Sequence, residues 1–177
     1  TLVADDAAPP APQLSALAQV AVRRTSPAAR AQATAALIDG GPWTEDAAWA
    51  ERDFGESEGR RWDACWADVP AAALDSAEAY LGFDPPGAER YEAVAVRVSG
   101  ALDALAAGRH LIITHAGPIR AALSATCGWG PDQVFAATIG HGGVVVLNHG
   151  QDGWTARIGL PGTGDREEHP NPAKGPT

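Results

Sequence analysis

The chain has 177 residues, which corresponds to one domain, and 45% hydrophobic residues are enough to form a packed core. Asp and Glu outnumber Lys and Arg by 22 to 13, and the formal net charge of −9 argues against nucleic acid or an anionic membrane as a partner. Apolar runs such as residues 111–113 and 144–147 are too short to cross a bilayer, and the N-terminus lacks a signal-peptide pattern. We therefore predict a soluble, cytoplasmic protein.

The cysteine and lysine content excludes several chemistries. Cys65 and Cys127 are far apart and not in a metal-ligand spacing, so we expect two buried free thiols rather than a disulfide framework or a zinc site. Lys174 is the only lysine, which removes a Schiff-base or phosphate-loop lysine from the body of the chain.

The first third of the chain alternates proline-rich, helical and irregular segments. Residues 1–12 are rich in proline and predict an extended lead-in. A short helix at 14–18 and a short strand at 20–22 precede an Ala-rich helix, which we expect to run from Ser26 as its cap to about residue 38. Residues 43–59 are acidic and aromatic without clean periodicity, and predict an irregular loop of the kind that often carries a site.

The middle of the chain predicts helices and one turn. The sequence predicts helical segments at 60–67 and 71–81, and the sequence Asp-Pro-Pro-Gly at 84–87 is typical of a turn. In residues 90–107 apolar side chains recur at helical spacing, and the glycine at 108 ends the pattern.

The last third predicts half of a βαβ unit and a hairpin. Residues 110–115 are a β-branched run typical of a buried parallel strand, and a tight turn leads into a helix at 119–126. Strands at 143–148 and 154–158 form the expected hairpin. We predict a single domain over residues 1–160 and a flexible C-terminal tail over 161–177, which is rich in Gly, Pro and charge.

His115 is the first candidate for a site residue. It lies at the carboxyl end of a predicted buried strand, where open α/β sheets place ligand groups. Its neighbours Ala116 and Gly117 are small enough to let a ligand approach the backbone. These residues alone do not distinguish a functional histidine from a capping or core histidine.

Arg30 and Glu51 are the other two candidates. Arg30 lies near the start of the Ala-rich helix, and a guanidinium forms paired hydrogen bonds with phosphate oxygens; a solvated surface arginine is the alternative. Glu51 lies among acidic and aromatic residues, and a carboxyl group against the rings of Trp49 or Phe54 would have the raised pKa of a general acid. A solvated acidic loop is the alternative for Glu51.

Four segments together resemble the histidine phosphatase superfamily, the phosphoglycerate-mutase-like enzymes. Residues 24–35 resemble its Ser-Pro-Leu-x-Arg-Ala-x-Gln-Thr-Ala helix, and residues 49–59 its Leu-x-Glu-x-x-Phe-Gly-x-Trp-Glu-Gly segment, with Ser57 in place of the usual Trp. Residues 86–89 match its Pro-Gly-Gly-Glu turn with one Ala for Gly, and residues 111–120 resemble its strand ending in the second histidine. The motifs occur in the right order and cover roughly residues 20–150.

The resemblance implies a fold, a reaction and roles for three residues. The fold is an α/β domain, a three-layer α/β/α sandwich with a mostly parallel central sheet. The reaction is hydrolysis of a small phosphorylated metabolite through a phosphohistidine, with Arg30 and His115 binding phosphate oxygens and Glu51 protonating the leaving oxygen. The implied reaction requires no metal, and we expect no cofactor. The compact insertion between Glu51 and the Pro-Gly turn resembles that of the small phosphatases, including the α-ribazole phosphatase group, more than that of the glycolytic mutases.

The chain departs from the family at the nucleophile. No Arg-His-Gly sequence occurs in it, although the family carries this triplet at the end of its first strand. Either a preceding segment with that strand is missing, which the absent Met and the short distance to Ser26 favour, or residues 1–6 are a degenerate first strand with Asp5 near the nucleophile's place. The alternative function is therefore an inactive homologue that binds a phosphorylated ligand or a protein.

The other histidines are weaker candidates. His141, in a Gly-rich stretch before a predicted strand, is a possible site neighbour. The remaining three, His110, His149 and His169, are expected to be incidental. The sequence carries no indication of the oligomeric state.

Overall fold

The structure is a computed structural model. It describes residues 17–38, 40–61, 64, 77, 81–137, 139–159 and, for the backbone alone, 168–169. The expected lead-in at 1–12 lies outside the described residues, as do most of the helical segments expected at 60–67 and 71–81 and most of the C-terminal tail.

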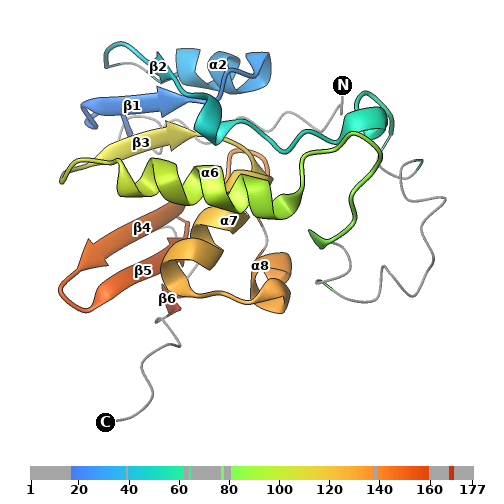
Figure 1. The fold of residues 1–177 in the computed structure, drawn as a ribbon. Helices are drawn as coiled ribbons and strands as arrows, with labels where there is room; N and C mark the ends of the chain where they lie inside the picture. Colours follow the sequence, from blue (N-terminus) through green and yellow to red (C-terminus); the bar gives the residue numbers. More distant parts are fainter. Residues whose placement is uncertain are drawn as a thin grey trace, which may run out of the picture.

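Three parallel strands form one sheet, in the upper part of Figure 1. Strand β1 (Val22–Thr25) lies between β2 (Thr44–Glu45) and β3 (His110–Ile113). Val22 pairs with His110 and Thr25 with Ile113, so β1 and β3 are aligned over their full length. Because all three strands run the same way, the segments that follow them emerge at one edge of the sheet.

Strand β1 begins two residues later than its apolar pattern suggested. Its inward-facing side chains are polar: Arg23 is 3% exposed and Thr25 2% exposed. The buried guanidinium donates its Nε–H to the carbonyl oxygen of Val20 at 2.6 Å, and another of its N–H groups bonds the carbonyl of Ala18. Backbone acceptors thus satisfy a charged side chain inside the fold, and a hydrophobicity pattern misses such a strand.

Two long helices make the core. Helix α6 (Tyr91–Asp103) buries Val94, Val98 and Leu102, whose spacing of four residues places them on one face. This face packs against helix α7 (Ala116–Cys127) and against Trp49. Helix α7 begins three residues earlier than expected, because Pro118 occupies its first turn, where a missing N–H costs nothing.

The remaining helices are shorter. Helix α2 (Ala29–Ala36) lies beside β1 at the top of Figure 1, and begins three residues after Ser26. Helix α8 (Pro131–Ala136), which the sequence pattern did not indicate, has proline at its first position. Its start is stabilised by Gln133, whose Oε1 accepts from the N–H of Gly130 at 3.0 Å. Two 3₁₀ turns, η1 (Ala47–Trp49) and η2 (Gly55–Ser57), interrupt the expected irregular loop.

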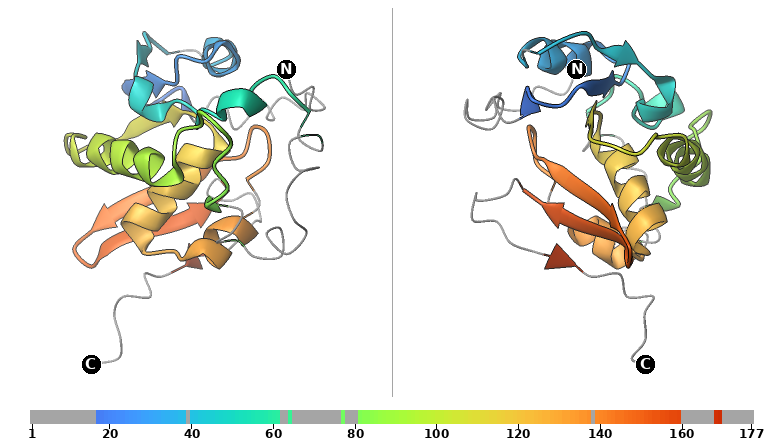
Figure 2. Two further views of the ribbon diagram at one scale, coloured as in Figure 1. Left: turned by 45° about the vertical axis from the view of Figure 1, so that its right-hand side comes forward. Right: turned by 90° about the vertical axis from the view of Figure 1, so that its left-hand side faces the viewer.

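The C-terminal half ends in an antiparallel sheet. The predicted hairpin consists of β4 (Val145–Gly150) and β5 (Gly153–Ile158), and β6 (Glu168–His169) adds a short strand to β5. Figure 2 shows α7 lying between α6 and this hairpin, as their contacts require. The molecule is therefore a mixed α/β fold, as predicted. None of the helices within the described ranges has the length and apolar character needed to span a membrane.

Candidate active site

The candidate site lies where β1 and β3 end. Ser26 follows β1 directly, and His115 follows β3 after one residue. The backbone N–H of Ser26 donates to the carbonyl oxygen of Ile113 at 2.8 Å, so the two chain ends stay together beyond the sheet. His115 Nε2 and Ser26 Oγ are 2.8 Å apart. The parallel register of β1 and β3 therefore brings a serine and a histidine, 89 residues apart in sequence, into hydrogen-bond contact.

His115 is held neutral. It is half-buried at the N-terminal boundary of α7, and burial, followed by the positive charges of Arg30 and Arg97, lowers its pKa to about 4. A neutral imidazole accepts a hydrogen bond at its unprotonated nitrogen. The Ser26 hydroxyl, which already accepts from the N–H of Ala28 at 3.2 Å, is placed to donate to Nε2.

Glu51 lies against the first turn of α7. Its Oε1 accepts from the N–H of Arg52 at 2.9 Å, and the backbone N–H of Gly117 also bonds the carboxylate. A Cβ atom at Gly117 would lie 2.2 Å from Oε1, so only glycine leaves room for the carboxyl group. Burial raises the pKa of Glu51 and outweighs the two hydrogen bonds and the charges of Arg30 and Arg120.

Arg30 completes the group of predicted residues. It is exposed in the first turn of α2, and its charge acts on both His115 and Glu51. Among the described residues, no hydrogen bond engages its guanidinium. The charge of Arg30 thus acts on both other predicted residues, and we call Arg30, Glu51 and His115 together the anion site.

The other predicted site neighbours have different positions. Ala116 and Gly117 form the first turn of α7, beside Glu51. His141 is exposed in the turn before β4, and within the described ranges no hydrogen bond joins it to the anion site. No group of three or more potential metal-ligating side chains occurs in the part of the chain that the structure describes.

Four further residues near the site were not predicted. Ser26 was expected only as a helix cap, although its place after β1, next to β3, is a signal for contact with His115. Arg120, on α7, donates its Nε–H to the carbonyl oxygen of Val134 at 3.0 Å, and its charge acts on both Glu51 and Tyr91. The Tyr91 hydroxyl is buried without a hydrogen-bond partner among the described residues, and burial raises its pKa.

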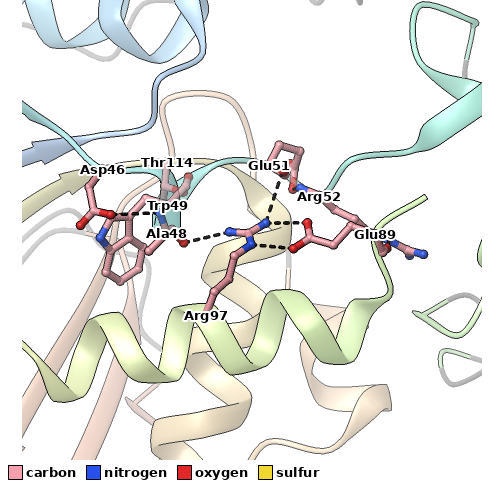
Figure 3. A network of polar contacts seen from close by, with 8 residues as sticks. All are labelled: Asp46, Ala48, Trp49, Glu51, Arg52, Glu89, Arg97 and Thr114. Carbon is pink, nitrogen blue, oxygen red and sulfur yellow. Dashed lines mark hydrogen bonds and ion pairs between the residues drawn. The ribbon is translucent and has the colours of Figure 1, made fainter. Parts of the chain in front are cut away.

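Arg97 is the fourth of these residues, and it binds the segment that carries Glu51 (Figure 3). Its guanidinium forms a paired interaction with the carboxylate of Glu89, with Nε to Oε1 at 2.8 Å and Nη2 to Oε2 at 2.9 Å. The same group donates to the carbonyl oxygens of Ala48 and Glu51. The Arg97 side chain pulls the pKa of Glu89 below its ordinary value.

Comparison with known proteins shows the family of the chain. The family model of the histidine phosphatase superfamily (branch 1) matches residues 6–158. The chain belongs to this superfamily. The match confirms the expected class of protein, a phosphatase of the histidine phosphatase type. No curated protein sequence matches the chain.

Solved structures with the same fold include proteins from mycobacteria and other bacteria. A mycobacterial glucosyl-3-phosphoglycerate phosphatase has a TM-score of 0.66 at 20% identity, over 84% of this chain and 80% of its own. YhfR of Bacillus stearothermophilus has a TM-score of 0.67 at 22% identity, over 85% and 77%. TTHB049 of Thermus thermophilus has a TM-score of 0.51 at 29% identity, over 66% and 64%. These similarities confirm the predicted phosphoglycerate-mutase-like α/β fold.

We predict that Gly117→Ala displaces the Glu51 carboxyl group. The new methyl group occupies the place of Oε1, and the flexible glutamate side chain moves out toward water. The pKa of Glu51 then falls toward its ordinary value of 4.5, because less burial opposes its charged form. The measurement is a pH titration of the Glu51 carboxyl carbon by NMR, with the signal assigned from Glu51→Gln.

Gly100→Ala is the matched control for this experiment. Gly100 is also a helical glycine, on α6, but beyond its own stretch of helix no atom of the described residues lies within 4 Å of its added Cβ. This variant should leave the pKa of Glu51 unchanged and stabilise the helix by roughly 0.5–1 kcal/mol. An unchanged Glu51 titration in Gly117→Ala would contradict the close approach.

We also predict that His115 titrates near pH 4 in the folded protein, against an ordinary value of 6.5. Between these pH values the unfolded chain binds a proton at His115 and the folded chain does not. Protonation therefore favours the unfolded state, and the free energy of unfolding decreases as the pH falls from 6.5 to about 4. NMR titration of the ring, assigned through His115→Asn, gives the midpoint. A midpoint at or above 6.5 would show that the imidazole is neither desolvated nor affected by the arginines.

Proposed function

We propose that this protein hydrolyses a small phosphomonoester at the anion site. The observation that carries the proposal is the meeting of three complementary groups: the unengaged guanidinium of Arg30, the neutral imidazole of His115 and the Glu51 carboxyl with its raised pKa. Phosphoryl transfer depends mainly on positioning and on stabilising charge at the phosphate oxygens. A cation, a neutral hydrogen-bonding ring and a proton donor match these needs.

Arg30 and His115 are the proposed phosphate-binding residues. A guanidinium forms two parallel hydrogen bonds with a phosphate group and keeps its charge at every physiological pH. The neutral His115 ring has one N–H to donate, and a bound phosphate raises its tendency to accept a proton. The net charge of −9 makes a local site of this kind necessary for a chain that binds an anion.

Glu51 is the proposed general acid. The leaving alkoxide needs a proton, and a carboxyl group can donate one near neutral pH only when its pKa is raised. Burial against α7 supplies that condition. In the family reaction, a nucleophilic histidine forms the P–N bond as the P–O bond breaks and Glu51 protonates the leaving oxygen. Water then attacks the phosphohistidine, gives a proton to the Glu51 carboxylate and releases phosphate.

The phosphoryl-accepting histidine is the one part of this reaction that the described residues do not supply. The resemblance assigns to His115 the binding of phosphate oxygens, and the printed chain contains no Arg-His-Gly sequence. Asp5 and the segment around it lie outside the described residues. The missing Arg-His-Gly sequence favours a second candidate function, in which the chain binds a phosphorylated ligand without turning it over.

The proposed substrate class rests on the relatives. One structural neighbour is a glucosyl-3-phosphoglycerate phosphatase, which acts on a small phosphorylated substrate. We propose a small phosphorylated metabolite for this chain as well, of the kind taken by the small phosphatases that its sequence resembles. The mechanism uses side chains alone and requires no metal.

Incubation with p-nitrophenyl phosphate separates the two candidate functions. We expect slow or absent turnover by the chain as printed, because the covalent route requires its nucleophile. Turnover with an acid-labile phosphohistidine would establish the hydrolase, and phosphate binding without turnover would establish the binding function. A phosphohistidine mapped to His115 or His141 would show that the proposed roles are wrong.

We predict that Arg30→Ala weakens the binding of inorganic phosphate or vanadate by about 1.5–3 kcal/mol, the range for a charge-assisted hydrogen bond. Isothermal titration calorimetry measures the affinity. Arg90→Ala is the control, since Arg90 is 72% exposed at the start of α6 and pairs with Asp84 and Glu92 instead. Equal affinities for Arg30→Ala and the unchanged chain would remove Arg30 from the site.

We predict that Glu51→Gln slows an alkyl phosphate far more than an activated aryl phosphate. The general acid contributes about 10²–10⁴-fold to the rate for a leaving group that needs a proton, and nitrophenolate needs none. The measurement is kcat for both substrates in any form of the enzyme that turns over. Glu56→Gln, in the exposed 3₁₀ turn η2, should leave both rates nearly intact. An equal loss of kcat on the two substrates would show that Glu51 is not the general acid.

A further inference from the structure

The segment that carries Glu51 has little regular structure of its own. After the 3₁₀ turn η1, residues 50–54 belong to no helix or strand. The carbonyl oxygens of Ala48, Trp49 and Glu51 accept instead from side chains on other elements. The position of the Glu51 carboxyl therefore depends on those side chains.

Arg97, on α6, binds two of the three carbonyl groups. Its Nη1 donates to the oxygen of Ala48 at 2.8 Å and its Nη2 to the oxygen of Glu51 at 3.4 Å. Figure 3 shows the guanidinium rising from α6 between these carbonyls and Glu89. The planar group thus bridges the helix and the segment at two points three residues apart.

Glu89 fixes the orientation of the guanidinium and also holds the segment beyond Glu51. Its carboxylate takes the Nε and Nη2 hydrogen bonds of Arg97 at 2.8 and 2.9 Å. Its own backbone N–H donates to the carbonyl oxygen of Asp53 at 2.9 Å, and its carbonyl accepts from Nε of Arg52 at 2.7 Å. Glu89 therefore holds the chain directly after Glu51, at Arg52 and Asp53.

Thr114 holds the third carbonyl from the opposite side. Its Oγ1 donates to the oxygen of Trp49 at 2.6 Å. Thr114 is the residue directly before His115, so this bond joins the Glu51 segment to the end of β3. A shift of the segment relative to His115 would have to break it.

We propose that Arg97, Glu89 and Thr114 act as one positioning unit, the Arg97 clamp, which sets the place of the Glu51 carboxyl relative to His115. None of the three touches the phosphate in this proposal; they act through Glu51. The clamp rests on the proposed function in one respect, that Glu51 is the acid. It requires arginine, because lysine has the charge but cannot form the paired interaction with Glu89 and reach a carbonyl at the same time.

The test compares charge with geometry at position 97. In Arg97→Lys the charge remains, but the planar guanidinium and its paired hydrogen bonds are lost. We therefore expect the Glu51 carboxyl to become more exposed to water and its pKa to fall toward 4.5. In Arg97→Gln the charge is also lost, so the pKa of His115 should rise in addition. NMR titration of the Glu51 carboxyl carbon and the His115 ring, together with the free energy of unfolding, gives all three quantities.

Thr114→Val keeps the test decisive if the arginine variants do not fold. The change removes one hydroxyl group from a β-branched side chain and leaves the charges intact. We expect a fall in the Glu51 pKa here as well. Arg90→Lys is the matched control at the start of the same helix, and it should leave both the Glu51 and the His115 titrations unchanged because Arg90 is exposed and contacts Asp84 and Glu92.

A purely structural role would give a different result. Variants that lower the free energy of unfolding but leave the Glu51 pKa at its original value would overturn the clamp. Where turnover is measured, we also expect the clamp variants to lose about 10²-fold in kcat on an alkyl phosphate, with KM unchanged. A shifted Glu51 pKa without a change in kcat would refute the proposed acid role of Glu51 and leave the clamp intact, so the two failures are distinguishable.

Discussion

The parallel pairing of β1 with β3 is the constraint on which the rest of the site depends. Their register, Thr25 opposite Ile113, ends both strands at the same level, and Ser26 continues the contact by bonding the Ile113 carbonyl. His115 and Ser26 meet only because of this alignment. A slip of one residue would turn the side chains of β3 to the opposite face and separate the two groups.

Some arginines of this acidic molecule stabilise the fold through ion pairs, whereas Arg30 lies at the anion site. Arg97 is paired with Glu89, and Arg52, which is 7% exposed, is paired with Asp84 and with backbone carbonyls. Arg30 stands outside these pairs, exposed beside His115 and Glu51. Arg97 and Arg52 are therefore balanced by carboxylates within the fold, whereas no ion pair engages Arg30 among the described residues.

Much of this arrangement was predictable from residue types and spacing. The interval of four residues between Val94, Val98 and Leu102 defines the buried face of α6, and the β-branched run before His115 coincides with β3. Both features are local in sequence. The grouping of Arg30, Glu51 and His115 followed from the family motifs, and the structure places them near one another, although their chemical roles remain proposals.

The features that escaped prediction share a physical cause. Arg23 occupies a buried strand position because carbonyl groups upstream of the strand satisfy its guanidinium, which a hydrophobic pattern cannot express. Arg97 binds a carbonyl oxygen 49 residues away, and a carbonyl acceptor leaves no trace in the identity of its residue. Polar contacts between side chains and distant backbone thus determine the site in detail, and they appear only with the tertiary structure.

The hydrogen bond between Glu51 and the backbone of Gly117 has a consequence for the proposed proton transfer. Gly117 lies in the first turn of α7, where the aligned peptide dipoles place partial positive charge. A neutral Glu51 carboxyl gains little from this field, whereas the carboxylate formed when it gives up its proton is stabilised by it. Burial makes the proton available, and the helix dipole favours the product of its release. Helix α7, which begins directly after His115, would therefore lower the free-energy cost of the negative charge that appears on Glu51 during the proposed proton transfer.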